Sequence, residues 1–326
     1  ALFNGLLAWL DQHQAVDRAY LEAHTRGFDA TLAQARDGLG SWSGLAAQLG
    51  LAQADLECFY QWFAATGRTV TLFSQGINQA RNGTAQATAI INAHLATGRV
   101  GRPGAGPFSI TGQPNAMGGR EVGGLANQLA VHLELDNPAH HQAVADFWGA
   151  PALARRPGLM AVDLFRAIEA GTVKAVWIIA TNPVDSLPEA DRVRAALRAC
   201  DTVVVSDCVS DTDTLEWADI AWPALAWGEK DGTVTNSERV IGRQRSFLAA
   251  PGEARPDWWA LCQVAKRLGF ADAFDYRHPA QIFREYAAMT GLARRFGKCL
   301  DLTAAAALTD SGYQQWTPRR WPFGES

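Results

Sequence analysis

The chain has 326 residues, of which 48% are apolar and 19% are charged, with a formal net charge of −4 at pH 7. This is the composition of an ordinary folded protein, and it excludes a disordered chain and a collagen-like chain. The balance of 29 Lys and Arg against 33 Asp and Glu predicts no binding to nucleic acid or to an anionic membrane. Because no apolar run approaches the ~18 residues of a membrane span, we expect a soluble, cytoplasmic protein.

The cysteines are few and scattered. They are Cys58, Cys200, Cys208, Cys262 and Cys299. Their odd number and the absence of CxxC spacing argue against a disulfide framework, a zinc knuckle or an iron–sulfur cluster held by this chain alone. We therefore expect these cysteines to be small buried apolar side chains in a reducing compartment, with no metal ligand among them. The N-terminal residues show no signal peptide, and both ends give the impression of being cut.

The first hundred residues have a mostly helical pattern. Apolar residues recur at helical spacing as Phe3, Leu6, Leu7, Leu10 and again as Leu56, Phe59, Tyr60, Phe63. The β-branched and aromatic run at 69–73 then predicts a buried strand. A polar turn leads into a predicted helix from about Thr84 to Thr97, which Gly98 ends.

Residues 99–124 contain eight glycines and fit neither a helical nor a strand period. A long segment of this kind is a folded binding loop or a mobile interdomain linker. Linkers are low in complexity, whereas this segment places Phe108, Ile110 and Met117 among polar residues. We expect a folded functional loop.

An alternating pattern of helices and strands follows. Helices are predicted at 159–170, 189–199 and 212–218, and strands at 176–180, 202–206 and 219–225. Continuous apolar strands between helices predict parallel strands that are buried on both faces. The predicted fold class is α/β, with a parallel-sheet dinucleotide-binding domain and a mainly helical N-terminal part.

After residue 225 the pattern changes again. Asp231-Gly232 predicts the turn of a hairpin, and residues 257–268 form a predicted Trp-rich helix, but the tail from about 300 has no clear period. We expect three parts. They are a helical segment at 1–50 that belongs to a neighbouring α/β domain, the α/β dinucleotide-binding domain at 51–225, and a hairpin with helices at 226–326 that returns to the neighbouring domain.

Polar residues follow three of the predicted strands. They are Gln75 and Gln79, Thr181-Asn182, and Ser206-Asp207. In an open parallel sheet, ligands bind outside the carboxyl ends of the strands, and a carboxylate accepts hydrogen bonds from ribose hydroxyls or purine N–H groups. Each residue could instead cap the helix that follows it. No GxGxxG turn and no GxxxxGK[ST] motif is present, so side chains would have to hold a nucleotide.

Two further candidates lie in the last third. Lys230, near the predicted hairpin turn, could reach a phosphate or pterin oxygen, or be a solvated turn lysine. Asp257, at the start of the Trp-rich helix, is most simply a cap or a dipole partner of that helix. The seven histidines show no HExxH motif or other metal-ligand spacing.

Read in order, six segments resemble the molybdopterin oxidoreductase family, and within it the catalytic subunits of assimilatory nitrate reductases. These segments are 75–84, 94–124, 173–183, 203–207, 228–239 and 251–259. The resemblance implies a multidomain α/β protein with a molybdenum atom held by two molybdopterin guanine dinucleotides. It implies reduction of nitrate to nitrite, with electrons from a donor protein or a reductase subunit.

The resemblance also assigns roles to residues. It implies that the cofactor contacts are Gln75, Gln79, Asn182, Ser206, Asp207, Lys230 and Asp257. Arg120 resembles the family arginine near the path of nitrate, and a guanidinium suits a planar oxyanion. The alternative for Arg120 is a salt bridge with Glu121 or another acid.

The chain departs from the family pattern in one respect. The cysteines for the iron–sulfur cluster and the cysteine that ligates molybdenum would lie upstream of Ala1, and the C-terminal pterin-binding domain would lie beyond Ser326. The resemblance therefore implies a central fragment that is inactive alone, with an iron–sulfur cluster only in the missing N-terminal part.

Three other interpretations compete with this one. Formate dehydrogenases share the glycine-rich loop but tend to carry Arg before Gly-Gln, where this chain has Thr111. A molybdenum-free electron-transfer subunit of the same fold needs no cofactor contacts, so the joint presence of Lys230, Asp207 and Arg120 disfavours it. A stand-alone dinucleotide-binding module would need a Gly-rich phosphate turn.

Overall fold

The computed structural model describes residues 1–324. It divides the chain into two compact units, Ala1–Gln113 and a second unit that begins at Pro114. Both combine helices with parallel strands, and the first is mainly helical, so the predicted α/β class and helical N-terminal part are confirmed. No helix in the described residues is long and apolar enough to cross a bilayer.

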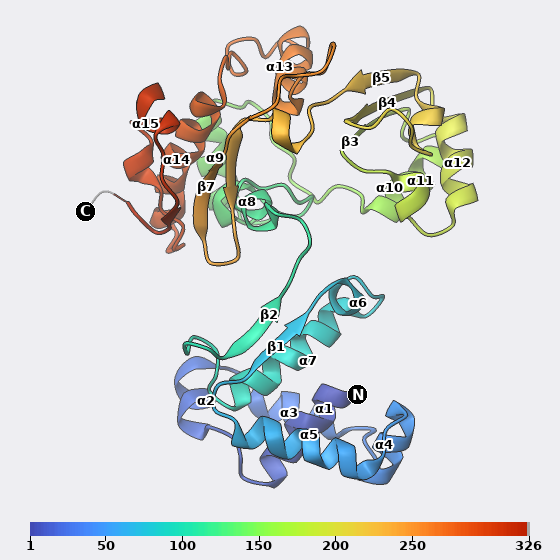
Figure 1. Cartoon of the computed structure of the whole chain (residues 1–326), viewed down its shortest axis with the longest axis vertical. Helices are drawn as coiled ribbons and strands as arrows, with labels where there is room; N and C mark the ends of the chain where they lie inside the picture. The colour runs from blue at the N-terminus through green and yellow to red at the C-terminus, as the bar shows by residue number, and fades with distance from the viewer. Residues whose placement is uncertain (325–326) are drawn as a thin grey trace. The chain divides into compact units, whose positions relative to one another are not determined.

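The first unit combines helices with two short strands, and α7 lies beside these strands (Figure 1). Its elements are α1 (Leu2–Gln12), α2 (Arg18–His24), α3 (Phe28–Arg36), α4 (Trp42–Leu49), α5 (Gln53–Ala65), β1 (Val70–Phe73), α6 (Gln75–Asn78), α7 (Gly83–Ala96) and β2 (Gly106–Ser109). The apolar stripes predicted on α1 and α5 meet in one core, where Leu6, Leu56 and Tyr60 are fully buried. The Tyr60 hydroxyl donates a hydrogen bond to the Leu2 carbonyl (2.8 Å), so its one polar group is satisfied.

Strand β1 pairs in parallel with β2, and Leu72 lies opposite Phe108. Thr71, on the other face, is hydrogen-bonded to His94 of α7. The prediction of a buried strand at 69–73 is only half right within this unit, since Leu72 is 60% exposed. The segment 99–124 is folded, but it is not irregular throughout: it contains β2 and α8 (Ala116–Glu121). The sequence pattern did not predict β2 or α8, because the glycines of this segment interrupt any regular spacing of apolar side chains.

The second unit contains the remaining elements. They are α8, η1 (Ala130–His132), α9 (Pro138–Trp148), α10 (Ala161–Glu169), β3 (Ala175–Ile179), α11 (Pro183–Ser186), α12 (Ala190–Ala199), β4 (Thr202–Asp207), η2 (Leu215–Trp217), β5 (Ile220–Pro223), η3 (Trp227–Glu229), β6 (Gly232–Thr235), β7 (Val240–Gln244), α13 (Asp257–Arg267), α14 (Pro279–Arg295), η4 (Thr303–Ala305), α15 (Asp310–Gln314) and β8 (Arg319–Arg320).

A parallel sheet in the order β3-β4-β5 forms one part of this unit. Helices α10 and α12 pack on one face, where Ile168, Val193 and Val205 are buried (Figure 1). Within the unit the opposite face is covered less completely than the predicted burial on both faces requires. Trp177 and Trp222 stack there with ring centroids 5.9 Å apart, and Ile220 remains 49% exposed.

An antiparallel sheet in the order β6-β7-β8 forms a second part. The predicted hairpin exists, but its turn lies at 236–239 and not at Asp231-Gly232. The carboxylate of Asp231 accepts two hydrogen bonds of 2.7 Å from Arg243, which joins the open ends of the two strands. Asn236 makes the actual turn, since its side-chain oxygen accepts from the backbone N–H groups of Glu238 and Val240.

The core of the remaining part is built by α14 and the C-terminal tail. Phe283 on α14 packs against Tyr313 and Trp316, and Leu300 and Leu302 are fully buried. The tail was uninformative in sequence because its buried residues lie in short turns with no repeating period.

The compact units do not coincide with the predicted domain boundaries. Leu6 and Leu45 share a core with Leu56, so the chain on both sides of residue 50 packs together. At the second boundary, Ala224 pairs with Arg255 in a β-bridge that joins the segments before and after 225/226. The assignment of 1–50, 51–225 and 226–326 to domains of a larger protein remains a prediction.

Two buried basic groups lie beneath β1. His94 is fully buried, and burial together with the nearby charge of Arg99 lowers its pKa from 6.5 to about 4. Arg99 is 3% exposed and donates to the carbonyl groups of Phe63 and Thr66. Neither is paired with a carboxylate among the described residues.

This arrangement predicts acid sensitivity of the first unit. The unfolded state binds a proton near pH 6.5 and the folded state only near pH 4, so stability is complete above 6.5 and falls as the pH is lowered towards 4. The loss should approach about 1.4 kcal/mol per pH unit. Urea unfolding at pH 7, 6, 5 and 4 checks this, with His94→Gln expected to flatten the slope and the exposed His24→Gln expected to keep it. If the free energy of unfolding of His94→Gln fell with pH as steeply as that of the parent, His94 would not be the cause of the acid sensitivity.

Candidate functional site

The carboxyl ends of β3 and β4 lie side by side and carry three of the predicted residues. Ile179 pairs with Ser206 in the parallel register, and the Ala180 N–H donates to the Ser206 carbonyl at 3.0 Å. Ala180 has a φ of 55°, which is unusual for a residue with a side chain. This left-handed turn ends β3 sharply and places Asn182 beside the end of the sheet.

Asn182 serves the fold through its side-chain oxygen. Its Oδ1 accepts hydrogen bonds from the backbone N–H (3.2 Å) and the hydroxyl (2.6 Å) of Thr214. Thr214 is fully buried, and its hydroxyl also accepts from the N–H of Val184 (3.1 Å). Asn182 therefore joins the loops that follow β3 and β4, and its side chain does not cap α11.

Ser206 and Asp207 end β4 with different environments. Ser206 is 3% exposed, and its Oγ accepts a hydrogen bond of 2.7 Å from the indole N–H of Trp177. Asp207 is half-buried, and one carboxylate oxygen accepts from the N–H of Val209 (3.1 Å). A carboxylate has about four acceptor positions, so Asp207 retains the capacity to bind a donor group.

Lys230 and Asp257 form an ion pair with each other, with 3.2 Å between Nζ and Oδ2. Both are partly buried, so Lys230 is neither a solvated lysine nor part of a hairpin turn. Asp257 is the first residue of α13, and Pro256 occupies the capping position. The second oxygen of Asp257 is buried and has no hydrogen-bond partner among the described residues.

Backbone pairing connects this ion pair to the end of the sheet. The Ala224 N–H donates to the Asp207 carbonyl (2.9 Å), and Ala224 forms a bridge with Arg255, two residues before Asp257. The structure thus brings together the end of β4 and the start of α13. The two carboxylates can accept from N–H and O–H groups, and the orphaned oxygen of Asp257 lacks a donor. These hydrogen-bond acceptors, together with the ammonium group of Lys230, fit a nucleotide-like ligand.

Gln75 and Gln79 belong to the first unit, where Gln75 begins α6 and Gln79 follows it. The Gln75 side chain accepts from the Ser74 hydroxyl, and Gln79 is exposed. Both follow β1, but β1 belongs to the sheet β1-β2 and not to the sheet β3-β4-β5, so the expectation of three strand ends in one sheet is wrong. The contact of Gln75 and Gln79 with a ligand remains a prediction.

Arg120 lies on α8 in the second unit and is exposed. Its Nη1 lies 3.4 Å from the Ala116 carbonyl, one turn earlier in the same helix. In the part of the chain that the structure describes, Arg120 forms no ion pair, so the alternative of a salt bridge with Glu121 is not what the fold uses.

Glu121 is instead fully buried. Its Oε2 accepts from the hydroxyls of Thr235 and Tyr286 (both 2.8 Å), and its Oε1 accepts from the indole N–H of Trp321 (2.7 Å). Asn115, at the start of α8, accepts from the N–H of Thr235 (2.8 Å). Burial and the negative charge of Glu121 raise the pKa of Tyr286, which keeps its hydroxyl a donor.

Sequence reasoning missed this network because its members are up to 200 residues apart. The only local signal was an acidic residue beside Arg120 and between two glycine pairs, at 118–119 and 123–124.

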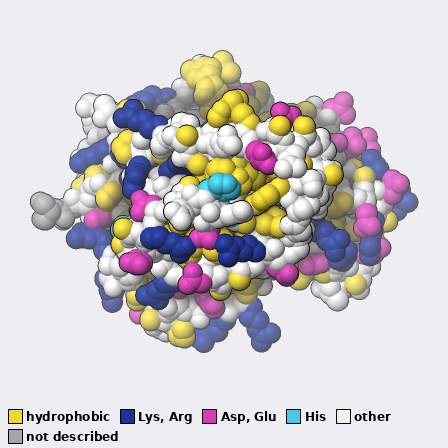
Figure 2. All heavy atoms as spheres, turned by 90° about the horizontal axis from the view of Figure 1, so that it is seen from below, with side chains coloured by type: hydrophobic (Ala, Val, Ile, Leu, Met, Phe, Trp, Pro, Cys, Tyr) yellow, Lys and Arg dark blue, Asp and Glu magenta, His cyan; other side chains and the backbone are white. Residues whose placement is uncertain are grey.

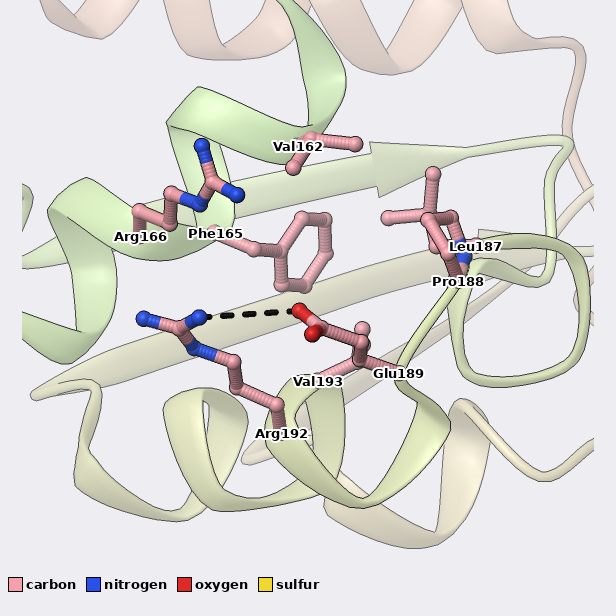
Figure 3. A pocket seen from close by; sticks show the side chains of 8 residues that line it. All are labelled: Val162, Phe165, Arg166, Leu187, Pro188, Glu189, Arg192 and Val193. Carbon is pink, nitrogen blue, oxygen red and sulfur yellow. Dashed lines mark ion pairs between the residues drawn. The ribbon is translucent and has the colours of Figure 1, made fainter. Parts of the chain in front are cut away.

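Two surface hollows lie elsewhere in the second unit. The first, between α10 and α12, has about 20 Å³ of free space, which is room for one water molecule (Figure 3). Arg192 and Glu189 both line it and form an ion pair (3.5 Å). The second is a wider groove of about 580 Å³ between α9 and α14, with Phe147 and Phe296 in its lining. Neither hollow is lined by a predicted site residue.

The described residues contain no group of three or more His, Cys, Asp or Glu side chains that could hold a metal ion. On the face seen in Figure 2, Lys and Arg side chains are interspersed with Asp and Glu side chains. This face therefore presents no broad positive surface that would attract an anion.

Comparison with known proteins adds the following findings. The sequence model of the family described as molybdopterin oxidoreductase matches residues 10–267. The chain is 46% identical to the nitrate reductase of Shewanella frigidimarina over all of this chain and 35% of that protein. It is 52% identical to the nitrate reductase of Klebsiella oxytoca over 85% of this chain and 32% of that protein. The chain thus spans about a third of the length of these relatives.

A solved structure shows the same fold. The acetylene hydratase from Pelobacter acetylenicus aligns with a TM-score of 0.69, covering 98% of this chain and 44% of that one. At 15% sequence identity, this likeness bears on the fold alone.

Proposed function

Since this chain belongs to the molybdopterin oxidoreductase family, we propose that it is part of a nitrate reductase that reduces nitrate to nitrite. The observation that carries the proposal is the free hydrogen-bond acceptor of Asp207 at the carboxyl end of the β3-β4-β5 sheet. Backbone pairing connects it to the ion pair of Lys230 and Asp257. The identities of 46% and 52% to two nitrate reductases support the choice of substrate.

In this proposal the residues at the sheet end hold the nucleotide portion of a molybdopterin guanine dinucleotide. Asp207 and Asp257 accept hydrogen bonds from the base and the ribose, and Lys230 balances the charge of Asp257 and can donate to a phosphate. Asn182 and Ser206 act mainly through the backbone that they fix, because their side-chain oxygens already accept internal hydrogen bonds. For the first unit we propose separately that the side-chain amides of Gln75 and Gln79 contact the cofactor.

The molybdenum centre would supply the electron transfer to nitrate, and this chain would bind and orient the reactants. Arg120 offers an exposed guanidinium in a protein with a net charge of −4. A guanidinium presents two parallel N–H groups to a planar oxyanion, so it can both attract nitrate and fix its orientation.

Other parts of the proposal concern the larger protein. We place the iron–sulfur cluster outside this chain, and a donor protein or reductase subunit supplies the electrons. We place the enzyme in the cytoplasm, because the odd number and scattered spacing of its cysteines are typical of a reducing compartment. The prediction that these cysteines are buried is wrong except for Cys262.

The cofactor role of Asp207 can be tested in the complete enzyme. Asp207→Ala removes a hydrogen-bond acceptor at the end of β4, so the molybdenum and guanine content of the purified protein should fall while the protein stays folded. Asp201→Ala is the matched control, because Asp201 lies at the opposite end of the same strand and is exposed. Elemental analysis and nucleotide release measure both contents. Full loading of Asp207→Ala would remove this residue from the site.

The substrate role of Arg120 can be tested by kinetics. Arg120→Ala should raise the KM for nitrate, because the loss of a charge-assisted hydrogen bond costs roughly 1.5–3 kcal/mol, or about 10- to 150-fold. Arg120→Lys keeps the charge but lacks the two parallel N–H groups of a guanidinium, so its KM should lie between those of the parent enzyme and Arg120→Ala. The control is Arg267→Ala, an exposed arginine that also bonds a carbonyl one turn earlier in its own helix. An unchanged KM in Arg120→Ala at full molybdenum content would contradict this role.

A further inference from the structure

The last turn of α8 is held by a single buried side chain. Glu121 is fully buried and accepts hydrogen bonds from Thr235 on β6, Tyr286 on α14 and Trp321 beside β8. A carboxylate has no hydrogen to donate, so it can face three donors at once. The network joins α8 to three segments that are far apart in the chain.

All three donors are neutral, and Glu121 forms no ion pair among the described residues. A buried carboxylate without a cation is costly, and a wholly apolar set of side chains in place of Glu121 and its donors would serve packing alone at lower cost. The presence of this polar network therefore needs a reason other than packing.

The backbone next to α8 is strained. Val131 and His132 in η1 have φ values of 54° and 61°, in the left-handed region that residues with side chains, and β-branched ones above all, rarely adopt. Gly123 brings this segment against the end of α8, since a Cβ there would lie 2.6 Å from the Ala130 nitrogen. Strain of this kind persists where the surrounding structure fixes it, and it clusters at functional sites.

Arg120 lacks an anchor of its own. Its side chain has one long contact of 3.4 Å to the Ala116 carbonyl and no carboxylate partner in the described chain. The direction of its guanidinium therefore depends on the orientation of the helix that carries it. Consecutive helical residues point about 100° apart around the axis, so fixing Glu121 in the interior also fixes the direction in which Arg120 leaves α8.

We propose that Glu121 is a positioning residue for substrate: it locks the last turn of α8 and so aims the guanidinium of Arg120 at the anion. This inference rests on the proposed role of Arg120 in binding nitrate. Tyr286, Thr235 and Trp321 support Glu121 and do not touch substrate.

The test combines variants of both residues in the complete enzyme. Glu121→Gln replaces an acceptor by an amide that must also donate, and Tyr286→Phe removes one donor while keeping the ring. Each should raise the KM for nitrate by roughly three- to tenfold with a smaller change in kcat. The reason is that the orientation of the Arg120 guanidinium is lost, whereas the groups that carry out the reaction are unchanged. In an Arg120→Ala background the same changes should raise the KM no further. Tyr286→Phe carries the test if Glu121→Gln does not fold.

The matched control is Tyr276→Phe, which removes a tyrosine hydroxyl bound to Glu285 elsewhere in the same unit. It should leave the KM unchanged. Molybdenum content and the thermal unfolding midpoint are measured for every variant, so that loss of cofactor or of folding is seen directly.

The outcomes separate the two proposals. An unchanged KM in Glu121→Gln and Tyr286→Phe, with a raised KM in Arg120→Ala, would overturn the positioning role and leave the nitrate role standing. Increases of equal size with and without Arg120 would also overturn it, since they would show a general effect on the fold. An unchanged KM in Arg120→Ala would overturn both.

Discussion

The hydrogen bonds to Glu121 connect a six-residue helix to three distant segments of the second unit, β6, α14 and the segment beside β8. These segments also contact one another, because β7 pairs with β8 and residues of β7, α14 and the C-terminal tail share one hydrophobic core. Helix α8 is too short to be stable by itself. Without Glu121, three donors would lose their acceptor together, so the position of α8 on this core depends on that side chain.

The parallel sheet solves a different problem, which is how to present acceptors without a glycine-rich phosphate turn. At the ends of β3 and β4, two side-chain oxygens are committed to the fold: Asn182 accepts from Thr214, and Ser206 accepts from Trp177. These internal bonds stiffen the loops. The carboxylates of Asp207 and Asp257 are then left with free acceptor capacity at fixed positions, and Asp257 keeps one oxygen with no partner among the described residues.

The parts of this structure that could be predicted from the sequence are those with a local cause. Helices α1 and α5 and strands β3 and β4 have regular apolar patterns, and the residues that end the strands are adjacent to those patterns. The turn at 236–239 was misplaced because Asp231-Gly232 has the composition of a turn, whereas the bond from Arg243 to Asp231 makes it the open end of the hairpin. The contact between Arg243 and Asp231 fixes the register of the hairpin, and this contact could not be predicted from the local sequence.

The same distinction applies to the candidate site, where the salt bridge between Arg120 and Glu121 was the alternative interpretation and is not formed among the described residues. Two adjacent residues of opposite charge suggest a local salt bridge, but in a helix side chains at i and i+1 do not face each other. When the helix packs, one of the two side chains must point inward. Glu121 does so, because three hydrogen-bond donors in the interior bind its carboxylate. The base is then left outside without a partner, in a protein whose overall charge would repel an anion. A free cation on a helix that is fixed from within is the arrangement that local attraction of an oxyanion requires.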